Sequence, residues 1–342
     1  MVSKRSLSFL GDLAVQPMST DPISILSAVP AIALGHYPTP VEELNGLRAA
    51  LGGGPRLFVK RDDSIGFAFG GNKIRKLELV CARALNEGAD TLITAGGVQS
   101  NHARVTAAVA ARHGLRCLLV ANGVPPDKLT ANALLDELFG AEVQYVKSRE
   151  DRSPAMVSAA AHLVAAGRHP YVIPVGASTP LGALGYVRAV GELVDQVTPP
   201  DVIVHASSSG GTQAGLVAGC RLYTQRTQVI GVSADDSAES LRQTIATLIA
   251  GIETFLQLAP SSLSDGSSLE VEDGFCGDGY GIPTEASREA LDLLARRDAI
   301  LLDPTYTAKA MAALIAYVRE SRFRNDQTVL FWHTGGQVNL FA

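Results

Sequence analysis

The segment Gly70–Glu78, with the sequence GGNKIRKLE, contains the residue best suited to covalent chemistry. Two glycines and an asparagine lead directly into Lys73, which opens a helical run predicted over Ile74–Ala84. At a helix start, backbone N–H groups and the positive end of the helix dipole disfavour the ammonium form of a lysine. A lysine that is neutral near pH 7 is a nucleophile suited to a Schiff base, so Lys73 is a candidate catalytic residue.

A second segment, Ser207–Gly215, places hydroxyl side chains and glycines directly after the apolar run Val202–Val204. Glycine lets the backbone approach a ligand closely, and hydroxyls beside helix-start N–H groups suit a phosphate. The sequence, SSSGGTQAG, is not a Walker A loop, and the lack of a G-x-G-x-x-G fingerprint disfavours a nicotinamide dehydrogenase. Alone, the segment is equally compatible with an ordinary turn between a strand and a helix.

A third segment, Gly96–Arg104, has the sequence GGVQSNHAR and also follows an apolar run. Ser100 and Asn101 are residue types that commonly cap helix N-termini, which is one interpretation of their position. The other interpretation is a second anion-binding nest, suited to a carboxylate. Together with Lys73 and the hydroxyl-rich loop, this segment indicates a phosphate-bearing ligand and a partner that carries a carboxylate.

Two tyrosines lie in turn-rich segments near the end of the chain. Tyr280 belongs to Asp278–Pro283 and Tyr306 to Leu302–Thr307, and Thr334 follows the last apolar run. In a parallel sheet, loops at the carboxyl ends of the strands face the ligand crevice. Taken singly, each tyrosine is also compatible with a packing role in which its hydroxyl is satisfied.

Short apolar runs that alternate with amphipathic helices must position these segments. The predicted strands are 91–95, 116–120, 143–146, 171–175, 202–204, 229–232 and 329–332, and the predicted helices include 101–113, 130–138 and 154–166. Strands that are apolar throughout and separated by helices indicate parallel sheets with helices on both faces, hence an α/β fold. The Ser/Gly/Asp-rich stretch 260–278 is predicted to be one long irregular loop.

Composition narrows the class of protein. The 342 residues are 46% hydrophobic and 18% charged, which is typical of a globular protein with large buried elements. A net charge of −5 argues against a broad surface for nucleic acid or anionic membrane. The four cysteines are scattered without a C-x-x-C pair, so we expect reduced thiols in a cytosolic protein and no metal site. No apolar run reaches membrane-spanning length.

In combination, these motifs resemble those of the pyridoxal-phosphate enzymes of fold type II, the tryptophan synthase β-like group. The likeness is greatest to the family of D-cysteine desulfhydrase and 1-aminocyclopropane-1-carboxylate (ACC) deaminase, and it extends from residue 36 to residue 336. It implies two domains. Residues 1–75 and 182–342 form a large domain that binds pyridoxal 5′-phosphate, with 1–30 as an extension, and residues 76–181 form a small α/β domain. The resemblance also implies a cytoplasmic homodimer that takes a small amino-acid substrate.

The resemblance assigns the cofactor-binding residues position by position. Lys73 resembles the lysine that holds the cofactor covalently and moves protons once substrate displaces it. Lys76, one turn further along the helix, resembles the family's phosphate-side lysine. Asn101 resembles the residue that bonds the ring hydroxyl. The phosphate cradle corresponds to Ser209, Gly210, Gly211 and Thr212.

On the substrate side, Ser100, Asn101 and His102 resemble the loop that grips the substrate carboxylate. Tyr280 and Tyr306 resemble the two active-site tyrosines. Together with the lysine, Ser100 and the two tyrosines are therefore the expected catalytic residues. Either the lysine on one face of the substrate or a tyrosine on the other removes the α-proton, and the sequence leaves both open.

Two departures from the ACC deaminase pattern bear on the reaction. ACC deaminases carry Glu after the second tyrosine and Gln at the third loop position, where this chain has Thr307 and His102. A hydroxyl from Thr307, or from Thr334, leaves the pyridine ring mostly neutral and weakens the electron sink. A weaker sink suffices to expel a good leaving group, so we expect conversion of D-cysteine to pyruvate, hydrogen sulfide and ammonia. The alternatives are an ACC deaminase-like activity and a lyase for another β-substituted alanine, such as cysteate.

Overall fold

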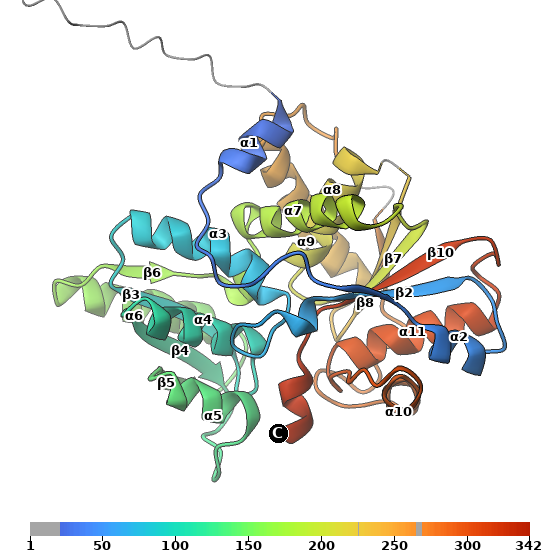
Figure 1. Ribbon diagram of the computed structural model, residues 1–342. Helices are drawn as coiled ribbons and strands as arrows, with labels where there is room; N and C mark the ends of the chain where they lie inside the picture. Colours follow the sequence, from blue (N-terminus) through green and yellow to red (C-terminus); the bar gives the residue numbers. More distant parts are fainter. Residues whose placement is uncertain (1–20, 225, 265–268) are drawn as a thin grey trace, which may run out of the picture.

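The structure, a computed structural model, describes residues 21–224, 226–264 and 269–342, and two sheets organise this part of the chain (Figure 1). The larger sheet has the strand order β1 (Val41–Glu43), β2 (Arg56–Arg61), β10 (Thr328–His333), β7 (Val202–Ser207), β8 (Gln228–Ser233) and β9 (Glu270–Glu272). The smaller has the order β5 (Glu142–Val146), β4 (Arg116–Asn122), β3 (Thr91–Gly97) and β6 (Pro170–Val172). Neighbouring strands are parallel except β1 and β2, so the predicted α/β fold with mostly parallel sheets is confirmed.

Helices cover both faces of the larger sheet. They are α2 (Asn45–Ala50), α7 (Pro180–Gln196), α8 (Gly211–Tyr223), α9 (Ala238–Phe255), α10 (Glu285–Asp298) and α11 (Thr307–Arg319). Successive side chains of a strand point to opposite faces. Val202 and Val204 of β7 therefore pack in one apolar core with α11, whereas Ile203 packs in another with α7 and α8. These apolar layers anchor the carboxyl ends of the central strands.

The smaller sheet is built in the same way. Its helices are α3 (Lys73–Asn86), α4 (Asn101–Arg112), α5 (Ala131–Leu138) and α6 (Arg152–Ala165). Leu92 of β3 belongs to the core that includes Val105 of α4, whereas its neighbour Ile93 packs with Met156 of α6. Strand β3 therefore ends with helices on both sides, and its carboxyl end opens toward the larger sheet.

Most predicted elements are present, and the exceptions have physical reasons. Strand β6 ends at Val172, before Pro174, although the Ile173 N–H still donates to Ile93 O (2.8 Å). The prediction of an irregular stretch over 260–278 was wrong at Glu270–Glu272, which forms the edge strand β9 beside β8. One apolar residue between two glutamates has no strand signature of its own, so pairing with β8 decides its conformation.

The predicted domain bounds stay a prediction, although every strand of the smaller sheet lies within residues 76–181. Of the predicted extension over 1–30, residues 1–20 lie outside the described residues. Pro22–Ala28 forms α1, which Asp21 caps by accepting from the Ser24 N–H (2.8 Å). Among the residues that the structure describes, no helix combines the length and apolar character needed to cross a bilayer.

Candidate active site

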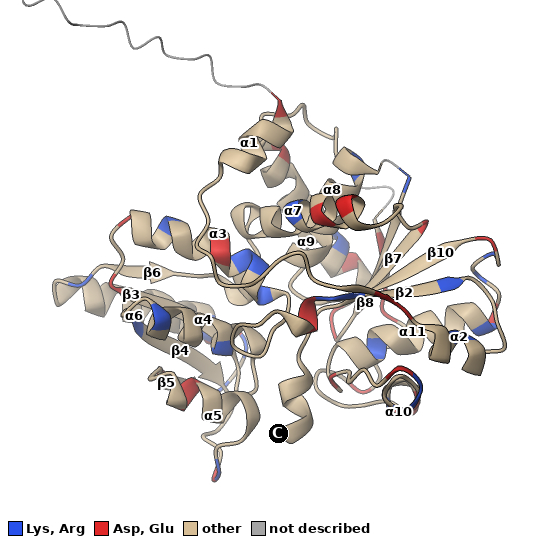
Figure 2. Cartoon of the chain, in the orientation of Figure 1, with Lys and Arg blue, Asp and Glu red and all other residues tan. Residues whose placement is uncertain are grey.

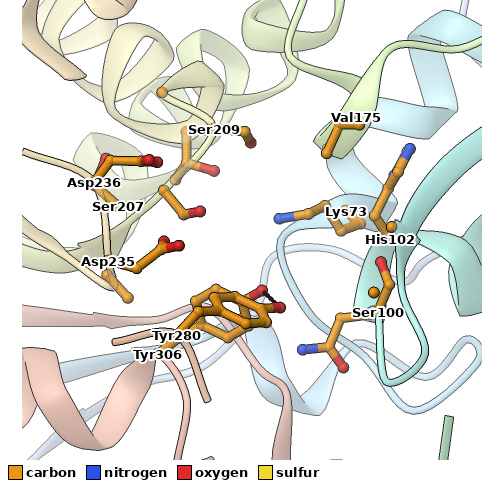
Figure 3. A pocket seen from close by; sticks show the side chains of 18 of the residues that line it. Lys73, Ser100, His102, Val175, Ser207, Ser209, Asp235, Asp236, Tyr280 and Tyr306 are labelled. Carbon is orange, nitrogen blue, oxygen red and sulfur yellow. Dashed lines mark hydrogen bonds between the residues drawn. The ribbon is translucent and has the colours of Figure 1, made fainter. Parts of the chain in front are cut away.

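A cavity of about 530 Å³ lies where the loops after β3, β7, β8 and β10 meet (Figure 3). Side chains from both halves of the molecule line it, and Figure 3 shows the Lys73 side chain pointing into the space between Ser207 on one side and Ser100 on the other. The predicted site residues that line it are Lys73, Ser100, Asn101, His102, Ser209, Gly210, Thr212, Tyr280, Tyr306 and Thr334. Lys76, Gly211 and Thr307 do not line the cavity.

Lys73 begins α3 directly after a turn that requires glycine. Gly70 and Gly71 have φ values of 69° and 104°, and a Cβ on Gly70 would lie 2.1 Å from the Asp63 carbonyl oxygen. Burial and, second, the nearby positive charge of Arg104 lower the pKa of Lys73 to about 8, whereas Asp303 opposes the shift. Desolvation is therefore the main cause of the lowered pKa, rather than the helix start from which the sequence argued.

The loop after β7 forms an anion cradle with Lys76. The side chain of Lys76 is fully buried, and its Nζ donates to Gly176 O (3.2 Å) and to Ser178 Oγ (3.4 Å). A Cβ on Gly211 would lie 2.9 Å from that Nζ, so only glycine lets the start of α8 approach the lysine. Burial and the charge of Lys73 lower the pKa of Lys76. Lys76 and Gly211 thus stand directly behind the cavity wall.

One polar group of this cradle has no partner. Ser207 Oγ is buried, lines the cavity and forms no hydrogen bond with any described residue. Gly210, with φ of 76°, precedes α8 and leaves the N-terminus of that helix open to the cavity. A phosphate would take up the free hydroxyl, the helix-start N–H groups and the charge of the lysine. Ser207 begins the hydroxyl-rich segment that the sequence marked as suited to a phosphate, whereas the resemblance assigned the cradle only from Ser209.

The loop after β3 supplies the opposite wall. Ser100 caps α4 by accepting from the Ala103 N–H (3.2 Å) and also lines the cavity, so its two predicted roles are compatible. His102 Nε2 lies 2.8 Å from Thr94 Oγ1, whose hydroxyl proton is donated to Ile173 O. Nε2 therefore carries the imidazole proton. Burial and the charges of nearby lysines hold the pKa of His102 well below its ordinary value, so the ring is neutral.

Tyr280 and Tyr306 meet on the floor of the cavity. Their hydroxyls share a hydrogen bond, and their rings lie edge to face with centroids 5.7 Å apart (Figure 3). Burial raises the pKa of both phenols, most strongly that of Tyr306, where the neighbouring Tyr280 adds to the effect. Both tyrosines are consequently protonated at neutral pH.

Lys309, which sequence reasoning missed, holds the loop that carries Tyr280. Its buried Nζ donates to the carbonyl oxygens of Ala234 (3.1 Å), Cys276 (2.6 Å) and Gly279 (2.8 Å). These carbonyls belong to two separate loops, one after β8 and one before Tyr280. A lone lysine within an alanine-rich helix carries no sequence signal for such a role, because its acceptors are backbone groups.

Thr307, predicted to face the pyridine nitrogen, does not line the cavity. It is fully buried in the first turn of α11, where its hydroxyl donates to Asp303 Oδ1 (2.7 Å) and accepts from the Asp303 N–H (2.7 Å). Asp303 also accepts from the backbone N–H groups that open the helix, so the capping arrangement engages the threonine hydroxyl. Of the two predicted threonines, Thr334 is the one that lines the cavity.

An ion pair joins two of the loops that line the cavity. Arg149, which follows β5, lies 2.5 Å from Asp235, which follows β8 (Nη1 to Oδ2). The guanidinium also lies over the ring of Tyr280, 4.9 Å from its centroid. Arg149 and Asp235 line the cavity and join the two halves of the molecule. No sequence signal marks this pair, because its partners are far apart in the chain.

Comparisons with known proteins match nearly the whole chain. Residues 32–335 match the family described as pyridoxal-phosphate dependent enzyme. D-cysteine desulfhydrases of Salmonella typhi and Salmonella newport are each 42% identical over 329 residues, covering 94% of this chain and 98% of theirs. The crystal structure of an ACC deaminase homologue superposes with a TM-score of 0.86 and 34% identity, covering 95% of this chain and 97% of the other. The structure of threonine deaminase isoform 2 from Solanum lycopersicum shares the fold. It superposes with a TM-score of 0.68 and 17% identity, covering 92% of this chain and 83% of the other.

Proposed function

Because the chain belongs to the family of pyridoxal-phosphate dependent enzymes, we propose that it is a lyase that converts D-cysteine to pyruvate, hydrogen sulfide and ammonia. One observation carries the proposal. A lysine with a pKa of about 8 points into a cavity bounded on one side by an anion cradle and on the other by a neutral polar loop. This is the arrangement that a covalently held, phosphate-bearing cofactor and an amino acid require. The similarity to D-cysteine desulfhydrases supports the choice of substrate.

The residues present fit pyridoxal phosphate. Lys73 would hold it covalently, Thr334 would face the ring nitrogen, and the free hydroxyl of Ser207 would join the predicted cradle at the phosphate. Lys76, buried without a carboxylate partner among its hydrogen bonds, would complement the phosphate charge. When bound, the cofactor supplies an electron sink for negative charge that develops at the substrate α-carbon.

The chain's own groups hold the substrate and move its protons. The hydroxyl of Ser100 and the amide of Asn101 bind the carboxylate at the start of α4, where the helix dipole favours an anion. Lys73 accepts the α-proton, since a pKa of about 8 leaves a useful fraction of neutral amine at neutral pH. The Tyr280–Tyr306 pair keeps its protons because burial raises both pKa values, so it orients the substrate from the other side.

The neutral character of Thr334 supports elimination of a good leaving group. A threonine hydroxyl beside the ring nitrogen would leave that nitrogen largely unprotonated and the sink moderate. A thiolate departs readily from the β-carbon under those conditions, whereas an unactivated cyclopropane ring does not open. The similarity to an ACC deaminase homologue makes ACC deamination the second candidate.

A substrate panel tests the proposal on the purified holoenzyme. Pyruvate and sulfide would be measured with D-cysteine and L-cysteine, pyruvate with L-cysteate and β-chloro-D-alanine, and 2-oxobutanoate with ACC. We expect the highest kcat/KM with D-cysteine and no turnover of ACC. Turnover of ACC alone would contradict the proposal, and turnover of cysteate alone would reassign the leaving group.

Two lysine variants test the cofactor attachment. Lys73→Ala should lose the visible absorbance band of the bound cofactor and at least about a thousandfold of the activity, because the covalent anchor is removed. Lys128→Ala, at an exposed lysine, is the matched control and should keep both. A Lys73→Ala protein with wild-type colour and rate would exclude this lysine as the anchor.

The assembly and location are also proposals. The resemblance to fold type II enzymes favours a homodimer, and the buried free thiols of Cys81, Cys117 and Cys220 suit a reducing cytoplasm. Sedimentation should give twice the 35.8 kDa of one chain, and a monomer at micromolar concentration would refute the dimer. Fractionation of cells expressing the chain would test the location.

A further inference from the structure

We propose that Arg104 is a positioning residue of the active site, which orients the amide of Asn101 and anchors the turn that precedes Lys73. Arg104 belongs to the motif that sequence analysis singled out at Gly96–Arg104, but it does not line the cavity. The inference rests on the proposed function, because it matters only if Asn101 and Lys73 serve the cofactor and the substrate.

The hydrogen bonds of the Arg104 guanidinium show which atom of the Asn101 side-chain amide is the oxygen and which is the nitrogen. Arg104 lies one turn after Asn101 on α4 and is 1% exposed. Its Nη1 donates to Asn101 Oδ1 (3.0 Å) and to Asn132 Oδ1 (3.0 Å). A guanidinium can only donate, so the amide atom that it contacts is the oxygen. Asn132 Nδ2 donates to the same oxygen (3.0 Å), which leaves the Asn101 N–H groups as donors for an anionic oxygen in the cavity.

The second terminal nitrogen of the Arg104 guanidinium contacts the turn that precedes Lys73. Arg104 Nη2 donates to Gly70 O (2.9 Å), three residues before Lys73. A Cβ on Gly71 would lie 3.9 Å from the same nitrogen. One rigid planar side chain thus sets Asn101 on α4 against the start of α3, and a lysine ammonium has no such geometry.

The charge of Arg104 is not neutralised by its partners. The three acceptors of its hydrogen bonds are neutral oxygens, and its Nε has no partner in the described part of the chain. Asp136 is the carboxyl group that acts on it, but burial raises the pKa of Asp136 to about 8, so it is mostly protonated at pH 7. Burying an unpaired cation is costly, which argues against a role in packing alone. Its charge favours the neutral amine of Lys73.

Two variants separate the hydrogen-bonding geometry of Arg104 from its charge. Arg104→Lys keeps the positive charge and loses the planar set of donors, whereas Arg104→Gln loses both. The full-length chain freed of cofactor would be labelled at lysine with formaldehyde and borohydride from pH 6 to pH 10, and Lys73 followed by mass spectrometry. Arg104→Gln should label about three- to tenfold more slowly than wild type at pH 7.5, because a shift of up to one pKa unit changes the neutral fraction by up to tenfold. Arg104→Lys should label at the wild-type rate.

Affinity for pyridoxal phosphate is the second readout. Both variants should bind it at least about tenfold more weakly than wild type, because neither restores the bidentate contact. Arg112→Gln, at an exposed arginine on the same helix, is the matched control and should match wild type in both assays. If circular dichroism shows that Arg104→Gln does not fold, the affinity of Arg104→Lys alone tests the proposal. Wild-type affinity in a folded Arg104→Lys would overturn the proposal.

These readouts do not depend on the substrate. Wild-type labelling and affinity in both variants would overturn the role of Arg104 and leave the proposed reaction standing. The expected changes, combined with no turnover of D-cysteine, would instead refute the reaction and retain the positioning role.

Discussion

Two groups of cations lie on or beside α3, and they differ in their partners. In the paired cluster, Arg75 donates to Asp62 (2.8 and 2.9 Å) and to Glu192 (2.8 and 3.0 Å), and Lys60 donates to Glu192 (2.6 Å). In the unpaired group, Lys73, Lys76 and Arg104 donate to neutral oxygens. Figure 2 shows basic residues gathered on α3, from which both groups draw members.

The paired cluster stabilises the fold, whereas the unpaired group serves the candidate active site. Besides Arg75, the Asp62 carboxylate accepts from Tyr186 (2.7 Å) and Trp332 (2.8 Å), so the paired cluster ties β2, α3, α7 and β10 together. The unpaired group adjoins the cavity. Burial, and then the nearby positive charges, lower the pKa of both lysines, and a bound anion would stabilise their charged forms. Along α3, Lys73 and Lys76 are three residues apart and share a face, whereas Arg75 turns away from it.

Breaking the paired cluster should have the largest effect on stability. Asp62→Asn should lower the free energy of unfolding by about 3–5 kcal/mol, because the buried cations Arg75 and Lys60 would then share the single negative charge of Glu192. Urea unfolding of the holoenzyme measures the change. Asp326→Asn, in the exposed pair with Arg324, is the control and should cost less than about 1 kcal/mol. A loss below that value for Asp62→Asn would show that the cluster is not a structural tie.

The unpaired group should make the cofactor-free chain more stable as pH rises from 8 to 10. Lys73 has a pKa of about 8 when folded, against an ordinary value of 10.5, so the unfolded chain binds more protons in that interval. Below pH 8 both states are protonated and the cost of burial is fully present. The gain over this interval should reach about 2 kcal/mol in urea unfolding. Lys73→Met should flatten the rise, and equal slopes for the two proteins would contradict this account.

Removing an unpaired cation should have the opposite sign from breaking the paired cluster. Lys76→Met should raise the free energy of unfolding of the cofactor-free chain by about 1–3 kcal/mol, because an apolar group of similar length removes the cost of burying or deprotonating the amine. The same variant should bind pyridoxal phosphate at least about tenfold more weakly. Destabilisation without loss of cofactor affinity would make Lys76 a structural residue.

The partly exposed pair of Arg149 and Asp235 should have the smallest effect. Arg149→Ala should change the free energy of unfolding by less than about 1 kcal/mol, since the arginine is solvent-exposed. It should lower kcat/KM a few-fold, because Tyr280 loses the cation over its ring. A double-mutant cycle with Asp235→Asn measures the coupling. Additive effects on kcat/KM would mean that the two residues act on the site independently.

Local signals carried most of the fold and much of the cavity lining. Glycines before Lys73 and hydroxyls after an apolar run are short-range features, because a turn and a helix start depend on neighbouring residues. Two side chains make contacts that the sequence does not announce. The Thr307 hydroxyl bonds Asp303, four positions earlier, and does not line the cavity, and Lys309 was missed because its acceptors are backbone carbonyls.

The sequence alone therefore determined the kind of chemistry, by placing a helix-start lysine, an anion cradle and a polar loop at the ends of predicted strands. Tertiary structure decided which buried cations are paired. Asp62 meets Trp332 across 270 positions of the chain, whereas Arg104 meets only neutral oxygens. A charge is desolvated by whatever packs around it, and that set of neighbours exists only in the folded molecule. The pKa of Lys73 is accordingly a property of the fold.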